Sequence, residues 1–302
     1  MQRSSETARP SNVPLIMSSV VLILLVVILA LFVPGDWWQV VVLGIVEGVT
    51  EFLPISSTAH LLITSQLLKF QGSIGGTFEI FIQFGAVLAV LGYYVRDLLR
   101  QVTTIQRDPA VQRLWLGVLI GFVPFAAIAF VLRKWVKSVL YETPSVIAWA
   151  LILGGIVFLV VELLPKRKTT THKIEEISLV QAFLIGISQV IALIPGVSRS
   201  GASIVTGLLV GVDRPTVTTF TFYLAIPTLG AATVVDLLGS LDQITTNDVA
   251  RLALGTIISM IVAWLSIDWL LRYVSRNSFV AFGIYRILAG IVLLVLAALR
   301  VV

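Results

Sequence analysis

Residues 44–63 read GIVEGVTEFLPISSTAHLLI, a run that is apolar apart from two glutamates, several hydroxyl residues and a histidine. Glu47 and Glu51 are spaced i, i+4, which places both carboxylates on one face of a helix. Pro54 interrupts that helix, and the row Ser56-Ser57-Thr58 follows almost at once. The stretch therefore predicts a broken helix with a polar tip inside an apolar segment.

The chain as a whole is too apolar for a soluble protein. Of its 302 residues, 58% are hydrophobic and only 12% are charged, whereas a soluble domain carries about 25% charged residues. Repeated apolar runs of about 20 residues predict a polytopic α-helical membrane protein. A β-barrel is excluded because its strands would alternate in polarity, whereas these runs are continuous.

Charge and cysteine content narrow the partners and the chemistry. The net charge of +5 comes from Lys and Arg in short loops, which is the positive-inside pattern of membrane proteins. We therefore expect a lipid bilayer and no nucleic acid as partner. The chain has no Cys, so disulfides, thiolate catalysis and Cys-ligated metals are excluded.

The apolar runs predict long membrane helices and two broken pairs. Seven runs are uninterrupted: 13–33, 77–95, 114–132, 145–164, 215–238, 249–271 and 278–301. The pairs are 38–54 with 56–70, and 177–195 with 197–212. Each half is marginal for spanning a core of about 30 Å. Two short helices meeting at a polar tip predict re-entrant hairpins at 38–70 and 177–212, which lipid tolerates only where protein or water surrounds the tip.

The two broken pairs also resemble each other at an offset of about 140 residues. Gly44-Ile45-Val46-Glu47 corresponds to Gly186-Ile187-Ser188-Gln189, and Pro54 to Pro195. Because three crossings separate the pairs, the repeats should have opposite orientation and share a site at their interface. We predict an all-α bundle of two inverted repeats, each a hairpin plus three helices, preceded by one extra helix. The predicted units are 1–36, 37–165, a basic cytoplasmic loop 166–176, and 177–302.

The two glutamates predict a functional site. A charge at the bilayer centre costs at least about 2.5 kcal/mol, and two like charges cost more unless a cation or a shared proton offsets them. Glu47 and Glu51 are therefore an acid/base pair or a divalent-metal site. The alternative is a structural pair neutralised by Arg199.

A second cluster, Pro195-Gly196-Val197-Ser198-Arg199-Ser200-Gly201, is suited to an anion. The planar guanidinium of Arg199 matches phosphate oxygens, and a helix starting here would direct its positive end at them. Ser198, Ser200 and Gly201 add further donors. The alternative is an N-cap serine beside a counter-ion for the glutamates.

The hydroxyl row of the first tip has two readings. Helix capping explains one hydroxyl, but Ser57 could also be a nucleophile if a base lies close, and His60 is one turn away. Ser56 and Thr58 would then help to bind phosphate. Glu79 and Gln83 could support this site or pair with each other, whereas Tyr285 and Arg286 are interpreted as interfacial anchors.

The stretches Glu47–His60 and Pro195–Gly201 resemble the two signature stretches of the undecaprenyl-diphosphate phosphatase (bacitracin-resistance) family. The resemblance covers about residues 37–300 and includes Phe282-Gly283-Ile284-Tyr285-Arg286. The segment 13–33 lies outside the family core, and Ala59 stands where glycine is frequent.

The resemblance implies a multi-pass enzyme of the bacterial plasma membrane whose site opens to the outer face. Its substrate would be a polyprenyl diphosphate, hydrolysed with the help of Mg²⁺ or Ca²⁺ held by Glu47 and Glu51. Ser57 and His60 are candidates for nucleophile and base, Arg199 holds the diphosphate, and attack by metal-bound water stays open. A homodimer is compatible with this reading.

The alternative function is a membrane transporter or lipid flippase, because inverted repeats and buried acids are also typical of transporters.

Overall fold

The computed structural model describes residue 35 and residues 37–70, 77–139, 143–164, 169–240 and 246–301. In these residues the structure is helical, apart from one isolated bridge between Thr171 and Val212. The expected helix 13–33 and nearly all of the expected unit 1–36 lie outside the described residues. The division of the chain into four units stays a prediction.

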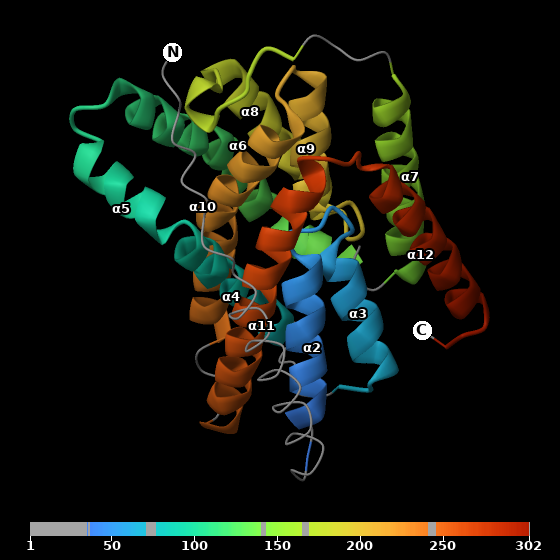
Figure 1. Cartoon of the computed structure of the whole chain (residues 1–302). Coiled ribbons are helices and arrows are strands. Elements are labelled where there is room, and N and C mark those ends of the chain that lie inside the picture. Colours follow the sequence, from blue (N-terminus) through green and yellow to red (C-terminus); the bar gives the residue numbers. More distant parts are fainter. Residues whose placement is uncertain are drawn as a thin grey trace.

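The first half of the chain forms a short helix pair followed by longer helices (Figure 1). The pair α2 and α3 meets at a break around Pro54, and α4 and α5 form a bent unit before the long α6 and α7. Their bounds are α2 Trp37–Thr50, α3 Ser57–Leu67, α4 Thr77–Tyr93, α5 Val95–Thr104, α6 Pro109–Val139 and α7 Pro144–Leu163.

The second half repeats this order. Two short 3₁₀ turns, η1 and η2, accompany the second short pair, and three long helices follow. Their bounds are η1 Ile174–Glu176, α8 Leu179–Ser188, η2 Gln189–Leu193, α9 Arg199–Leu209, α10 Arg214–Ser240, α11 Thr246–Val274 and α12 Val280–Ala298. Both predicted broken pairs are therefore confirmed as pairs of short helices.

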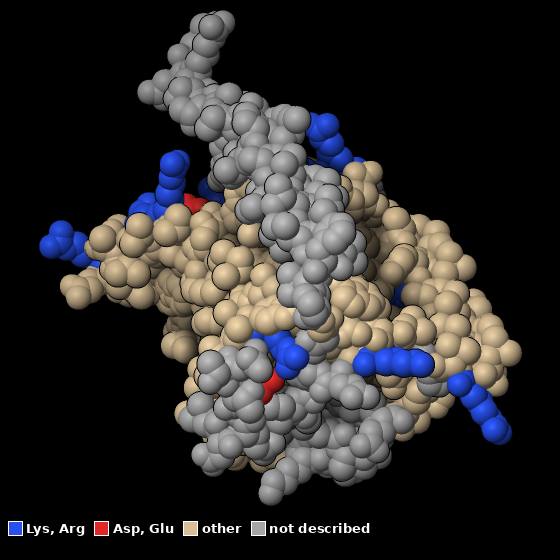
Figure 2. Space-filling view, turned by 90° about the horizontal axis from the view of Figure 1, so that it is seen from below, with Lys and Arg blue, Asp and Glu red and all other residues tan. Residues whose placement is uncertain are grey.

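Five helices, α6, α7, α10, α11 and α12, are long and apolar enough to cross a membrane. The polytopic helical membrane fold is therefore confirmed. Most of the described surface in Figure 2 is uncharged, with scattered Lys and Arg side chains, as expected of a chain whose apolar side chains face lipid.

The sequence predicted one uninterrupted membrane helix over residues 77–95, but the structure has a bend there. The chain bends by 69° between Phe81–Tyr93 and Val95–Thr104, and the segment after residue 95, which lies between two predicted membrane helices, begins with helix α5. This helix is amphipathic, with exposed Leu99 and Val102 beside Arg96 and Arg100. The prediction missed α5 because it relied on uninterrupted apolar runs, and the charged residues of α5 interrupt such a run.

The two short pairs close in the same way. Ser56 and Ser198 both have positive φ, 73° and 72°, and each caps the next helix by accepting the backbone N–H three residues on. The far ends are also tied: Gln39 Nε2 donates to the Leu68 carbonyl at 2.7 Å, and Gln181 Nε2 to the Val210 carbonyl at 3.0 Å. Each pair is therefore a hairpin whose outer ends are hydrogen-bonded together.

Figure 1 shows the hairpins approaching from opposite ends of the bundle, α2–α3 from below and α8–α9 from above. Their packing is also matched, since α2 packs on α11 and α8 on α6. Both contacts need glycine: a Cβ on Gly186 would lie 2.1 Å from the Gly121 Cα, and one on Gly44 would lie 2.9 Å from the Gly255 carbonyl oxygen.

A buried arginine joins the two tips. Arg286, on α12, is 1% exposed and hydrogen-bonds to five backbone carbonyls. Its Nη1 donates to the carbonyls of Pro54 (3.1 Å) and Val197 (3.0 Å), one on each tip. The remaining carbonyl acceptors are Gly196 on the second tip and Ala150 and Leu151 on α7.

The expectation that Arg286 is an interfacial anchor is therefore wrong. A guanidinium has five N–H donors, and five carbonyls receive them in the centre of the bundle. The side chain fits because α7 has Gly154 here: a Cβ at that position would lie 2.0 Å from Nη2.

Arg286→Met should lower the thermal stability of the purified protein, because five buried carbonyls would lose their donors. A loss of about 3–5 kcal/mol corresponds to a fall in Tm of about 10 °C. Arg286→Lys, with three donors, should lie between this variant and the wild type. Arg300→Met, at an exposed position, is the control. An Arg286→Met protein with the same Tm as this control would contradict the stabilising role of the Arg286 hydrogen bonds.

Candidate active site

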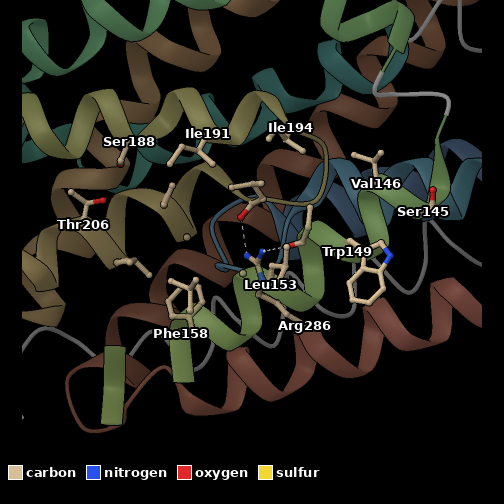
Figure 3. Close-up of a pocket in the computed structure, with 17 residues that line it drawn as sticks. Ser145, Val146, Trp149, Leu153, Phe158, Ser188, Ile191, Ile194, Thr206 and Arg286 are labelled. Carbon is tan, nitrogen blue, oxygen red and sulfur yellow. Dashed lines mark hydrogen bonds between the residues drawn. The ribbon is translucent and has the colours of Figure 1, made fainter. Parts of the chain in front are cut away.

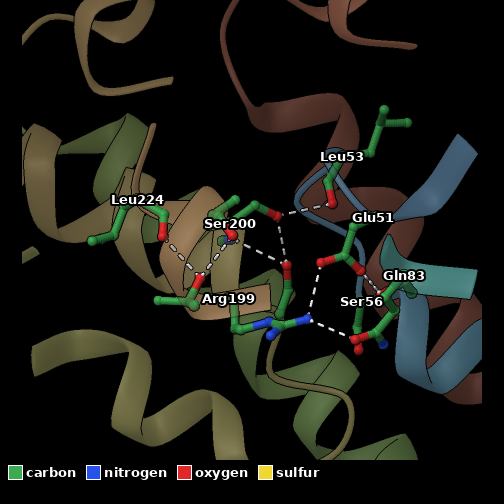
Figure 4. Close-up of polar contacts among 12 residues, drawn as sticks. Glu51, Leu53, Ser56, Gln83, Arg199, Ser200 and Leu224 are labelled. Carbon is green, nitrogen blue, oxygen red and sulfur yellow. Dashed lines mark hydrogen bonds and ion pairs between the residues drawn. The ribbon is translucent and has the colours of Figure 1, made fainter. Parts of the chain in front are cut away.

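The two hairpin tips meet through an ion pair between Glu51 and Arg199. Arg199 Nη2 lies 3.0 Å from Glu51 Oε1, and the Glu51 side chain is only 5% exposed (Figure 4). The same Nη2 donates to Gln83 Oε1 on α4 at 3.3 Å. The structure thus brings the acidic motif and the arginine motif together, as the sequence predicted, and it places Gln83 beside them.

The Ser57 hydroxyl donates to the other carboxylate oxygen of Glu51. Glu51 therefore stands between a guanidinium on one oxygen and a serine hydroxyl on the other. Both Ser57 and Glu51 are buried, so this contact is held away from bulk solvent. A carboxylate in hydrogen-bond contact with a serine hydroxyl can accept its proton, which is the arrangement required to activate a nucleophile.

His60 is engaged elsewhere. Its Nδ1 lies 2.8 Å from the Ser56 carbonyl oxygen and its Nε2 lies 2.7 Å from the Tyr285 hydroxyl. Because a carbonyl only accepts, Nδ1 carries a proton, and in the neutral ring Nε2 accepts from Tyr285. Glu51 is therefore hydrogen-bonded to Ser57, whereas His60, the base suggested by the sequence, is not.

Glu47 lies one turn before Glu51 and is fully buried. Neither of its carboxylate oxygens has a hydrogen-bond partner within the described part of the chain. An unpaired buried carboxylate is costly, so the position favours a proton or a bound cation.

The donor set at the first tip fits a cation that arrives together with phosphate. Mg²⁺ is typically held by one or two carboxylates plus substrate phosphate oxygens and water, and Glu47 and Glu51 supply two carboxylates. Over the described ranges, no group of three or more His, Cys, Asp or Glu could hold a metal ion. The site therefore does not resemble an all-protein zinc centre.

The hydroxyls of the second tip have structural partners. The Ser198 hydroxyl accepts the Gly201 N–H at 3.1 Å and lies 3.0 Å from the Ser200 hydroxyl. Ser200 donates to the Leu53 carbonyl at 3.1 Å and so ties the second tip to the first. Helix α9 begins at Arg199, and its N-terminal dipole adds positive potential at this point.

A polar cavity lies between the tips. Its walls come from both hairpins and include Glu51, Ser57, Thr58, Ser198 and Arg199. Arg199 is 22% exposed in its side chain, and its Nε and Nη1 have no hydrogen-bond partner among the described residues. Of the two arginines that contact the tips, Arg199 therefore has N–H donors left for an anion, whereas all N–H donors of Arg286 are engaged.

Three residues contribute more than the sequence indicated. Gln83 bonds Arg199, Tyr285 bonds His60, and Arg286 holds the tips. For Tyr285 and Arg286 the sequence signal was a Tyr-Arg pair inside an apolar helix. From the sequence pattern alone such a pair is interpreted as an interfacial anchor. Glu79 is only partly buried and lies on the same helix as Gln83.

Comparison with known proteins identifies the family. The family profile described as "Bacitracin resistance protein BacA" matches residues 40–292. An "Undecaprenyl-diphosphatase" of Deinococcus radiodurans is 46% identical over 268 residues, 87% of this chain and 96% of that protein. Proteins with the same name from Wolinella succinogenes and Caulobacter vibrioides are 42% and 37% identical, covering 86% and 85% of this chain and 97% and 96% of their own lengths. The chain therefore belongs to the bacitracin-resistance BacA family.

Proposed function

We propose that this protein is an undecaprenyl-diphosphatase. It hydrolyses undecaprenyl diphosphate to undecaprenyl phosphate and inorganic phosphate, and so recycles the lipid carrier for peptidoglycan synthesis. The observation that carries the proposal is the contact series Ser57–Glu51–Arg199 between the two tips. The names of the three relatives, all "Undecaprenyl-diphosphatase", support it, and no observation favours the transporter alternative.

The residues suggest a two-step reaction. Glu51 takes the proton of Ser57 as the Ser57 oxygen attacks the terminal phosphorus. The anhydride P–O bond then breaks to release undecaprenyl phosphate. Water then attacks the phosphoseryl group, releases inorganic phosphate, and the serine recovers its proton. Attack by an activated water without a phosphoserine is the alternative.

Arg199 would hold the terminal phosphate. Its Nε and Nη1 are each available to donate to a phosphate oxygen, and the α9 N-terminus supplements the charge. Ser56, Thr58, Ser198, Ser200 and Gly201 stay predicted phosphate-binding residues, and of these the Thr58 hydroxyl has no partner among the described residues. A divalent cation, Mg²⁺ or Ca²⁺, held by Glu47 and Glu51 would neutralise phosphate charge and help the leaving group depart.

His60 stays a predicted catalytic residue. Its contacts favour a positioning role: through Ser56 on one side and Tyr285 on the other, it connects the first tip to α12.

We further propose that both hairpins are re-entrant, that they belong to inverted repeats, and that the site opens to the outer face. The matched caps, the hydrogen bonds between the hairpin ends and the opposite approach in Figure 1 support this. The basic residues near the ends of the second hairpin favour the cytoplasmic side for it. A homodimer stays a prediction from the sequence.

Glu51→Gln and Arg199→Ala should each lower kcat for phosphate release from undecaprenyl diphosphate by at least about 100-fold, because the first removes the base that accepts the Ser57 proton and the second removes positive charge at the reacting phosphate. The assay uses protein purified in detergent, with and without chelator; chelation should slow the wild type and Mg²⁺ should restore it. Asp97→Asn and Arg100→Ala, which break an exposed ion pair of 3.7 Å, are the controls. Full activity in Glu51→Gln would remove Glu51 from the mechanism.

Ser57→Ala separates the two candidate nucleophiles. If Ser57 attacks phosphorus, kcat should fall by about 10⁴-fold or more, and acid quenching of the wild type should trap phosphoserine. Ser65→Ala on the same helix, whose hydroxyl donates to the Leu62 carbonyl, should keep the wild-type rate. Substantial activity in Ser57→Ala would assign the attack to water.

The absence of Cys allows a direct test of sidedness. A single cysteine at Lys69, at the end of the first hairpin, should react with a membrane-impermeant maleimide on intact cells. Cysteines at Lys173 and Arg276, both exposed, should react only after permeabilisation. Labelling of Lys69 and Lys173 from the same side would contradict the inverted arrangement.

A further inference from the structure

A second, mostly apolar cavity lies against the outside of the site. It is a groove of about 560 Å³ between α7 and the second hairpin (Figure 3), which we name the α7–α9 groove. Trp149 and Leu153 line it from α7, Ile191 from η2 and Val205 from α9. Trp149, Leu153 and Ile191 are 53%, 57% and 59% exposed, so this wall presents apolar side chains to whatever fills the groove.

The groove and the polar cavity share one wall. Val197 and Gly201 line the groove, whereas Ser198 and Arg199, on the same turn, line the polar cavity. An occupant of the groove would therefore end within one turn of the phosphate-binding arginine.

The deep end of the groove can accept an apolar chain although a charged residue lies there. Figure 3 shows Arg286 among the lining residues, with hydrogen bonds to the carbonyls of Val197 and Ala150. Because its N–H donors are engaged by backbone carbonyls, it offers no donor to a polar ligand in the groove. Two of the other lining residues, Ala150 and Ala202, have small apolar side chains.

We propose that the α7–α9 groove binds the part of the polyprenyl tail that adjoins the diphosphate. This rests on the proposed function, since the occupant is the tail of that substrate. The volume lies in the range of about 300–1,000 Å³ typical of small-ligand sites, so the groove holds a proximal portion of the tail while the remainder lies in the bilayer. The position of the groove, on the other side of the turn that carries Arg199, favours the substrate tail over the acyl chains of bulk phospholipid.

A tail-length comparison tests this directly. Leu153→Trp narrows the groove, and it should lower the ratio of kcat/KM for undecaprenyl diphosphate to that for a five-carbon prenyl diphosphate by about 10-fold, through KM for the long substrate. Ile156→Trp is the matched control, because Ile156 is 44% exposed on the same helix but does not line the groove. An unchanged ratio in Leu153→Trp, or an equal fall in Ile156→Trp, would overturn the proposal.

Photo-crosslinking gives a readout that does not depend on turnover. A polyprenyl diphosphate with a photoreactive group near its head should crosslink to α7 and α9 peptides of the wild type and of Glu51→Gln. Excess undecaprenyl phosphate should suppress the crosslink, and excess phospholipid should not. Suppression by phospholipid would mean that ordinary lipid occupies the groove, and would overturn the proposal.

The two proposals fail separately. Absence of phosphate release from every polyprenyl diphosphate by the wild type would overturn the proposed function, even with the crosslink in place. Normal turnover with an unchanged length ratio would overturn the groove proposal alone.

Discussion

The site depends on one buried guanidinium. Two irregular turns from distant parts of the chain carry backbone carbonyls at the centre of an apolar bundle, and such carbonyls are costly without a donor. Arg286 supplies donors to Pro54 of one turn and to Gly196 and Val197 of the other. It thereby links the two tips to each other, and through two more carbonyls it links them to α7.

The two hairpins differ in chemistry although their turns and ends are built alike. The hairpins have the same caps and the same end contacts, but the acids are on the first and the free arginine donors are on the second. Glu47 corresponds to Gln189, whose amide nitrogen donates to Ser203. One hairpin thus carries the proposed base and the other the proposed anion site, and the contact between Glu51 and Arg199 brings the two together.

The division between polar cavity and apolar groove follows from the same turn. Residues 196–201 direct Ser198 and Arg199 to one side and Val197 and Gly201 to the other. An amphiphilic substrate with a charged head and a long apolar tail needs both environments in contact. The buried Arg286 is compatible with the apolar side because its N–H donors are already hydrogen-bonded to backbone carbonyls and need no partner from a ligand.

The sequence by itself determined the membrane class, five of the long helices, the two broken pairs and the residues of the two motifs, because hydrophobicity and Pro, Gly and hydroxyl signals are local. Only the tertiary structure decided which side chains touch. It paired Ser57 with Glu51 and His60 with Tyr285, and it placed Arg286 in the centre of the bundle instead of at the interface. Local pattern cannot predict these contacts, since each joins segments far apart in the chain or selects one of several partners within reach. For Arg286 the deciding factor was a set of carbonyls whose need for donors arises only once the chain has folded.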